Sequence, residues 1–174
     1  TAKKTVTISP IVDAPLTGGF ETPTCPTAKW IIQNPDGSLT WEKTTAAKTG
    51  TGAIFIDNYD YPTANSIDKF HSPVIKYNAA ADSFFVSFDY AYSQGITYPG
   101  STNLPLDTLE IQITQDCGQT FTTVWKKWGA DLQTIGDPNQ ANGARFTPNN
   151  NQWKNVNIYL SPVIGTGDFQ VYFV

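Results

Sequence analysis

The chain has 174 residues, a net charge of −4 and a pI near 4.7, with 13% aromatic and only 15% charged residues. This length fits one domain that can fold alone, and the acidic balance argues against nucleic acid as a partner. No apolar run approaches the roughly 20 residues of a membrane-spanning helix, so we expect no membrane insertion. Thr1 carries neither an initiator Met nor a signal-peptide pattern, which indicates a mature chain or an excised fragment.

Short strand signals bounded by turn residues recur along the chain. We expect residues 1–17 to be an N-terminal extension or an edge strand, and residues 18–174 to be one jelly-roll β-sandwich domain. The predicted strands are 5–8, 29–33, 39–43, 52–57, 70–77, 83–92, 108–114, 120–128, 153–160 and 168–174. A short helix is expected only near residues 129–133. No window carries an apolar stripe of period 3.6, so the predicted fold class is all-β, a two-sheet antiparallel sandwich of jelly-roll type.

Alternation of apolar and polar residues predicts which side chains face the core. It is clearest in residues 109–114 and 155–160, where every second side chain is apolar and is expected to point inward. The segment 84–92 instead begins with apolar residues on both faces. It therefore predicts a central strand that is covered on both sides, with Phe84 and Phe85 both in the core.

The two cysteines, Cys25 and Cys117, lie far apart in the sequence. Both stand in polar turn sequences, where buried thiols are unusual, which favours a disulfide between them over two buried free thiols. Such a bond would close a long loop and contribute about 4–5 kcal/mol in the chain-entropy model. It would also place the protein in an oxidising, extracellular compartment.

Three long loops are the expected places for binding, because loops on a rigid sandwich often carry function. Exposed aromatic rings stack on the C–H faces of sugars, while Asn, Asp and Gln bind sugar hydroxyls. The alternative is that a loop aromatic packs beneath its own loop. The candidate ligand-binding residues in or beside the loops 58–68, 93–107 and 129–152 are Tyr59, Tyr61, Tyr98 and Trp128.

Catalysis is not expected. Asp107 and Glu110 are the nearest to a pair of glycosidase carboxylates, but residues three apart in one strand point to opposite faces. The only histidine, His71, stands at a strand start beside Ser72 and is expected to be structural. One histidine and two separated cysteines also leave too few ligands for zinc.

Several segments in chain order resemble one recurring bacterial jelly-roll module, a galactose-binding or MAM-like fold related to eukaryotic MAM domains and to cleaved-adhesin domains. In Bacteroidetes it follows pappalysin-like secreted metallopeptidases or stands in surface adhesins. The matching segments are Gly19-Phe-Glu21, Asn34-Pro-Asp-Gly37, Gly52 to Asn58, His71-Ser-Pro-Val-Ile75, Phe88-Asp-Tyr-Ala91, Asp107-Thr-Leu-Glu110 and Asp116 to Phe121.

The resemblance implies a structural calcium ion, with Glu21 in the position of a metal-binding acid. Calcium takes six to eight oxygens from carboxylates and loop carbonyls, and Asp57, Asn58, Asp89 and Asp36 are further candidates. The alternative is that Asp36 forms its turn, Asp57 ends a strand and Asp89 is a solvated outward residue.

The preferred interpretation is a non-catalytic adhesion or accessory module of a secreted or cell-surface protein. It would bind a glycan or a surface protein through loop aromatics, beside other domains of the same parent chain. The alternatives are a purely structural spacer beside a metallopeptidase and, less favoured, a glycosidase. Fold resemblance alone does not decide among them.

Overall fold

The computed structural model describes residues 9–21, 29–94, 106–136 and 145–174. In these residues strands dominate and the helices are single turns, which confirms the all-β prediction. The elements are β1 (Ile11–Asp13), β2 (Ile31–Gln33), β3 (Glu42–Thr44), β4 (Ala53–Phe55), β5 (Lys69–His71), β6 (Val74–Lys76), β7 (Phe85–Tyr90), β8 (Thr108–Thr114), β9 (Thr122–Trp128), α1 (Gly129–Leu132), β10 (Lys154–Tyr159), α2 (Ser161–Ile164) and β11 (Gln170–Phe173).

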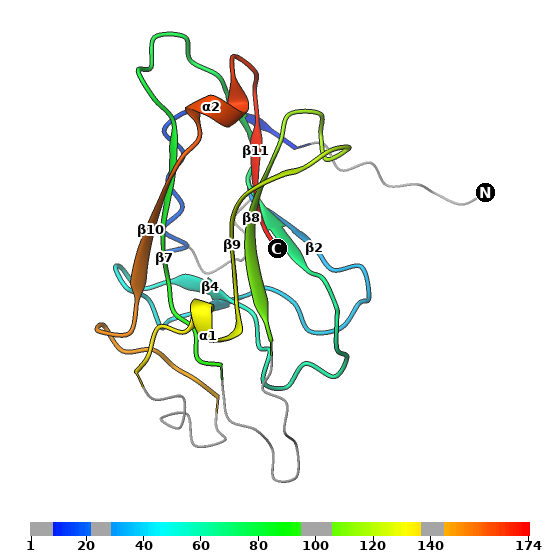
Figure 1. Cartoon of the computed structure of the whole chain (residues 1–174), viewed down its shortest axis with the longest axis vertical. Helices are drawn as coiled ribbons and strands as arrows, with labels where there is room; N and C mark the ends of the chain where they lie inside the picture. The colour runs from blue at the N-terminus through cyan, green and yellow to red at the C-terminus, as the bar shows by residue number, and fades with distance from the viewer. Residues whose placement is uncertain (1–8, 22–28, 95–105, 137–144) are drawn as a thin grey trace, which may run out of the picture.

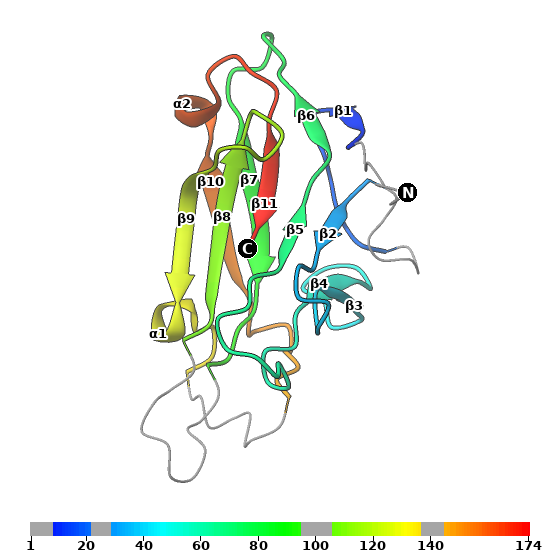
Figure 2. The same ribbon diagram turned by 90° about the vertical axis from the view of Figure 1, so that its right-hand side faces the viewer.

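The strands form two main layers. One is a five-stranded antiparallel sheet in the order β2-β5-β11-β8-β9, which Figure 2 shows nearly face-on. The other contains the antiparallel pair β7–β10, which stands apart from β8 and β9 in Figure 1. Two smaller pairs, the parallel β1–β6 and the antiparallel β3–β4, flank these layers. The arrangement is that of an all-β sandwich.

Apolar side chains between the layers form the core. The alternation predicted for residues 109–114 and 155–160 is confirmed at its buried positions, since Ile111 and Leu160 are completely buried. Aromatic rings join the two layers: Phe88 of β7 lies edge-on to Trp125 of β9 and to Phe173 of β11, with ring centroids 5.8 and 5.3 Å apart. These contacts pack β7, and through its pairing β10, against the five-stranded sheet.

The expected strand 70–77 is interrupted at Ser72 and Pro73, so that β5 and β6 join different sheets. Proline has no backbone N–H and cannot continue a sheet ladder as a donor. The Ser72 side chain takes part in the interruption, because its Oγ accepts a hydrogen bond from the Val171 backbone N–H at 3.0 Å. The sequence prediction of one continuous strand is therefore wrong at this point.

The prediction for residues 84–92 also needs correction. Within the described residues, β7 is paired only with β10, so it is not a central strand. Phe84 is buried as expected, but Phe85 is 54% exposed and points away from the core. Successive residues of a strand point to opposite faces, and the outer side chains of this layer, Phe85 among them, are exposed.

The remaining elements close the ends of the sandwich. The expected helix near residues 129–133 is present as α1, whereas α2 was not predicted. The strand β1 lies within residues 1–17, for which an extension or an edge strand was expected, and the predicted strand 5–8 lies outside the described residues. Residues 11–13 pair with β6, and Val12, Ala14 and Leu16 pack against the core. No helix in the described part of the chain is long and apolar enough to cross a membrane.

Candidate functional site

The first group of predicted site residues lies in the loop between β4 and β5. Arg145 holds this loop, because its Nε lies 2.9 Å from Oδ2 of Asp57 and its Nη2 lies 2.5 Å from Oδ2 of Asp60. The two carboxylates, Asp60 first, raise the pKa of the Arg145 guanidinium. Asp57 therefore acts as an ion-pair partner, while its neighbour Asn58 is exposed.

Tyr61 is bonded to carboxylates of its own and an adjacent loop. Its hydroxyl donates to Oδ2 of Asp68 at 2.6 Å and lies 3.2 Å from Oδ2 of Asp36. Asp68 is only 6% exposed and also accepts a hydrogen bond from Thr40 Oγ1 at 3.0 Å. Desolvation, followed by the bond to Asp68, raises the pKa of Tyr61 to about 12. The hydroxyl of Tyr61 thus has its partners within the protein.

The other predicted aromatic contacts are spread over the molecule. Tyr59 is 45% exposed in the β4–β5 loop, and Trp128 is 49% exposed at the end of β9. Tyr59 thus comes from the loop that precedes β5, whereas Trp128 ends β9, and β11 and β8 lie between these two strands in the five-stranded sheet. Tyr98 lies outside the described residues.

The predicted calcium ligands have separate protein partners. Glu21 accepts hydrogen bonds from the Thr51 backbone N–H at 2.8 Å and from Thr51 Oγ1 at 2.6 Å, and these bonds lower its pKa. Asp89 of β7 accepts a hydrogen bond from Nδ2 of Asn155 of β10 at 3.0 Å. No three acidic, His or Cys side chains gather as metal ligands would within the described ranges. A calcium site stays a prediction.

The carboxylate of Glu21 lies close to the backbone of Gly50 as well as to Thr51. Gly50 has a positive φ of 71°, and a Cβ atom at this position would lie 2.0 Å from Oε1 of Glu21. The positive φ favours glycine at this position, and a larger residue would displace the Glu21 carboxylate from Thr51. The hydrogen bonds between Glu21 and Thr51 thus link the segment before β2 to the segment between β3 and β4.

The predicted disulfide cannot be placed from the described residues. Cys117 is an exposed thiol in the turn after β8, where it has a positive φ of 59°. Its predicted partner, Cys25, lies outside the described residues. The pairing of the two cysteines stays a prediction.

The residues weighed for catalysis lie in different environments. His71 is 3% exposed, stacks on Tyr172 with ring centroids 4.3 Å apart, and burial lowers its pKa. Asp107 accepts the hydroxyl of Tyr92 at 2.9 Å, whereas Glu110 forms an ion pair with Lys126. Each of these groups already has a partner among the described residues, which favours a structural role.

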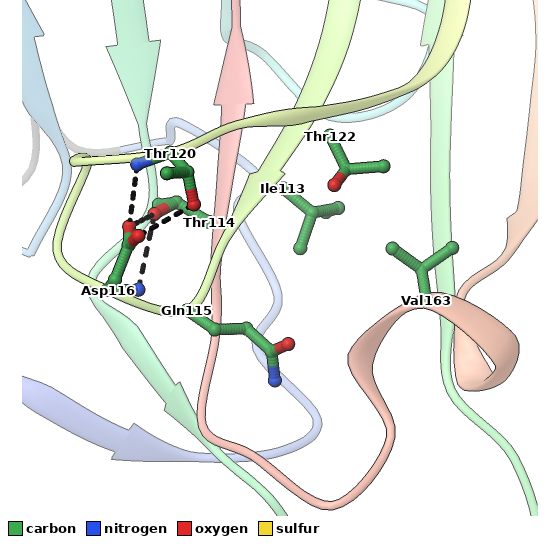
Figure 3. A pocket seen from close by; sticks show the side chains of 7 residues that line it. All are labelled: Ile113, Thr114, Gln115, Asp116, Thr120, Thr122 and Val163. Carbon is green, nitrogen blue, oxygen red and sulfur yellow. Dashed lines mark hydrogen bonds between the residues drawn. The ribbon is translucent and has the colours of Figure 1, made fainter.

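A small hollow lies between the β8–β9 turn and α2 (Figure 3). Its volume of about 150 Å³ is below the roughly 300–1,000 Å³ of typical ligand pockets. The acid at its rim, Asp116, accepts hydrogen bonds from Thr114 Oγ1, from the Gln119 N–H, and from both the N–H and Oγ1 of Thr120. These bonds, Thr120 Oγ1 first, hold the pKa of Asp116 well below its usual value. The small volume of the hollow and the internal hydrogen bonds of Asp116 favour a structural turn over a ligand pocket.

The outer face of β7 and β10 is different, because its outward side chains are all exposed. Three cross-strand pairs follow one another along the strands, and we call their six residues the β7–β10 face. In Figure 1 this layer is at the left of the molecule, with its outer side turned away from the five-stranded sheet. The pairs are Phe85 with Tyr159, Ser87 with Asn157, and Asp89 with Asn155.

Phe85 and Tyr159 form the apolar end of the β7–β10 face. Their ring centroids lie 5.2 Å apart with an interplanar angle of 40°, and the side chains are 54% and 52% exposed. The backbone of this end is fixed, because the Leu160 N–H donates to the Phe84 carbonyl at 2.8 Å and the Ser161 Oγ accepts the Phe84 N–H at 2.9 Å. The two rings thus present one apolar surface on a rigid support.

Sequence reasoning missed this face although a signal was present. Residues 85, 87 and 89 alternate with residues 86, 88 and 90, and residues 155, 157 and 159 do the same on β10. Two consecutive phenylalanines, Phe84 and Phe85, hid the pattern because both were assigned to the core. The alternation of Asn155, Asn157 and Tyr159 would have shown that the outward row ends in an aromatic residue.

No protein-family model matches the chain, and no curated protein matches it in sequence. The resemblance to MAM-like modules therefore stays an expectation.

Proposed function

We propose that this chain is a non-catalytic carbohydrate-binding module of a secreted or cell-surface protein, and that the β7–β10 face is its binding surface. The observation that carries the proposal is the pair of exposed rings, Phe85 and Tyr159, on a rigid sheet beside a row of small polar side chains. Rings of this kind remove the C–H faces of a sugar from water, while neighbouring amides and hydroxyls bind its hydroxyl groups.

The position of the face differs from the loop surface expected from the sequence. The carboxylates of the β4–β5 loop are held by Arg145 and Tyr61, so they have internal partners that a ligand would have to replace. By contrast, Ser87 and Asn157 on the β7–β10 face have side chains without a hydrogen-bond partner among the described residues. Free hydrogen-bonding groups favour the sheet face over the loop as the binding surface.

We also propose that the strands are connected as in a jelly roll and that the chain is a MAM-like module. A jelly-roll topology is supported by the return of β11 to the middle of the five-stranded sheet and by the crossings between layers after β6 and β10. This connectivity agrees with a MAM-like accessory module, for which the resemblance implies a structural calcium ion. Function is still argued from the β7–β10 face, because a fold of this kind hosts many activities.

The test is a glycan array followed by titration calorimetry with whichever glycans bind, each with and without a chelator. Phe85→Ala and Tyr159→Ala are expected to weaken binding by at least about tenfold, because each removes half of the apolar surface. Tyr59→Ala and Trp128→Ala are the matched controls, since these rings are exposed to a similar degree. They are expected to leave the affinity unchanged.

Two outcomes would overturn this proposal. Silence across the array would leave a structural spacer as the better interpretation. Loss of binding in Tyr59→Ala or Trp128→Ala, with Phe85→Ala unaffected, would place the surface at the loops instead. A fall in the melting temperature on chelation would show separately that a cation stabilises the fold.

A further inference from the structure

We infer that the ligand is a neutral, extended oligosaccharide that lies lengthwise along β7 and β10, and this rests on the proposed function. One sugar ring would stack on Phe85 and Tyr159. The following rings would be bound through their hydroxyls by the polar pairs of the same face. The inference thus concerns the orientation, length and charge of the ligand.

The orientation follows from the order of the three cross-strand pairs. Outward residues of one strand are two positions apart, which corresponds to about 6.6–6.8 Å along the strand. The pair Phe85–Tyr159 and the pair Asp89–Asn155 are therefore separated by about 13 Å, with Ser87 and Asn157 between them. A single sugar ring on the aromatic pair would not reach the far end, whereas an extended oligosaccharide would.

The hydrogen-bonding groups along this path are available. The hydroxyl of Ser87 and the amide of Asn157 have no side-chain hydrogen-bond partner among the described residues. At the far end, Nδ2 of Asn155 donates to Oδ1 of Asp89, which leaves Oδ2 of Asp89 and Oδ1 of Asn155 as acceptors. The face thus offers both donors and acceptors in its middle and acceptors at its end, the combination that vicinal hydroxyl groups satisfy.

The charge of the face favours a neutral ligand. Asp89 is its only charged member, and the nearest cation in sequence, Lys154, donates from Nζ to the Gln133 backbone carbonyl at 2.6 Å. The protein as a whole carries a net charge of −4. A uronate or sulfated sugar placed at the far end would be repelled by the Asp89 carboxylate.

The size of the face favours an oligosaccharide over a protein partner. A standard protein–protein interface uses about 20–30 residues and about 800 Å² on each side, with an apolar centre. The β7–β10 face has six outward side chains, of which only Phe85 and Tyr159 are apolar. A second copy of the chain docked through this face would leave most of its polar groups poorly paired.

The experiment compares ligands of increasing length. Cello-, manno-, xylo- and laminari-oligosaccharides from the monosaccharide to the hexasaccharide are titrated into the intact protein by calorimetry, with oligogalacturonate as an acidic ligand. The affinity is expected to rise with length and then level off, and oligogalacturonate is expected to bind at least about tenfold more weakly than the best neutral ligand.

Variants then separate the two ends of the face. Tyr159→Ala is expected to weaken binding by at least about tenfold at every length. Asn157→Ala and Asn155→Ala are expected to weaken the long ligands by about fivefold to tenfold and to leave the shortest binding ligand unchanged. Asn151→Ala, an exposed amide in the turn before β10, is the matched control and is expected to bind like the parent.

Each result tests either the orientation and charge of the ligand or the carbohydrate-binding function itself. Equal affinity of Asn157→Ala and the parent at all lengths, with Tyr159→Ala weakened, would overturn the lengthwise orientation while the carbohydrate function stands. Preference for oligogalacturonate would overturn the neutral ligand class. Failure of every oligosaccharide to bind would overturn the proposed function itself. Retained circular dichroism spectra and melting temperatures of the variants would show that these losses do not come from unfolding.

Discussion

The β4–β5 loop and the β7–β10 face both present aromatic and polar side chains, but they differ in how those groups are bonded: the loop carboxylates and the Tyr61 hydroxyl have partners within the protein, whereas Ser87 and Asn157 of the face have none among the described residues. In the loop, Arg145 pairs with Asp57 and Asp60, and the Tyr61 hydroxyl is bonded to Asp68. The polar groups there fix the conformation of a segment that has no strand of its own. The role of these residues is accordingly to order the loop.

On the β7–β10 face the backbone is already ordered by the sheet ladder and by packing of the inner side chains. The outward residues are exposed and lie outside the core cluster, so we expect them to contribute less to folding than the inner residues. Exposure of a single aromatic residue is common, but Phe85 and Tyr159 are directly opposite each other. The next pair along the strands is Ser87 and Asn157, whose side chains have no hydrogen-bond partner among the described residues. The proposal of the β7–β10 face as the binding surface therefore rests on which side-chain groups are available, rather than on residue type alone.

The strongest test of this contrast uses two neighbouring residues of β10. Ile158→Ala is expected to lower the free energy of unfolding by about 2–5 kcal/mol, because Ile158 is buried and its truncation leaves a cavity. Tyr159→Ala is expected to cost less than about 1 kcal/mol, since only a cross-strand ring contact is lost. Guanidinium unfolding measures both. Equal losses would mean that Tyr159 is a structural residue and would weaken its assignment to binding.

The next largest effect is expected in the loop. Asp68→Ala is expected to lower the free energy of unfolding by about 1–3 kcal/mol, because it removes the buried acceptor of Tyr61 and Thr40. Asp36→Ala is the control and is expected to have a smaller effect, since Asp36 is exposed and lies farther from the Tyr61 hydroxyl. Neither variant is expected to change glycan affinity in calorimetry. A loss of affinity in Asp68→Ala would return the loop to consideration as the binding surface.

A pH effect is expected from His71, which lies in neither region. Burial lowers its pKa from the usual 6.5, so the unfolded chain binds a proton over a pH range in which the folded protein does not. The stability contributed by neutral His71 is therefore complete above about pH 6.5 and falls as the pH is lowered through that value. Unfolding curves at about pH 7.5 and 5.5 measure this, above the range in which the carboxylates titrate.

His71→Gln serves as the control for the pH effect. The variant loses the ring contact with Tyr172 and is expected to be less stable at both pH values. The difference between its two unfolding free energies should nevertheless be smaller than in the parent protein. An unchanged difference would show that His71 is not the group responsible.

The smallest effect is expected at the ion pairs of Arg145. This side chain is exposed, so solvent screens its pairs with Asp57 and Asp60 and an exposed pair contributes little to stability. Arg145→Gln is expected to shift the unfolding midpoint slightly at low salt and not at all in high salt. A large shift that persists in high salt would show that Arg145 holds the loop through packing as well as charge.

The sequence was sufficient for the class of fold and for most strand positions. Turn residues such as Asn34, Pro35, Asp36 and Gly37 mark where strands end, and the alternation in residues 109–114 places Ile111 and Ile113 in the core. These are local effects of backbone geometry and side-chain size. The interruption at Pro73 could also have been predicted, because proline disfavours the interior of a strand.

The candidate site was decided by the tertiary structure. Alternation determines that Phe84 and Phe85 point to opposite faces, but it does not determine which face a second layer covers. That choice depends on the packing of β7 against β9 and β11, strands more than 30 residues away in the chain. The same holds for Asp57, whose partner Arg145 comes from a distant segment. The residue types and the alternation of apolar residues along a strand can be seen in the local sequence. The exposure of a side chain and its hydrogen-bond or ion-pair partners are decided only when separate segments meet, because they depend on which neighbours remove water from that side chain.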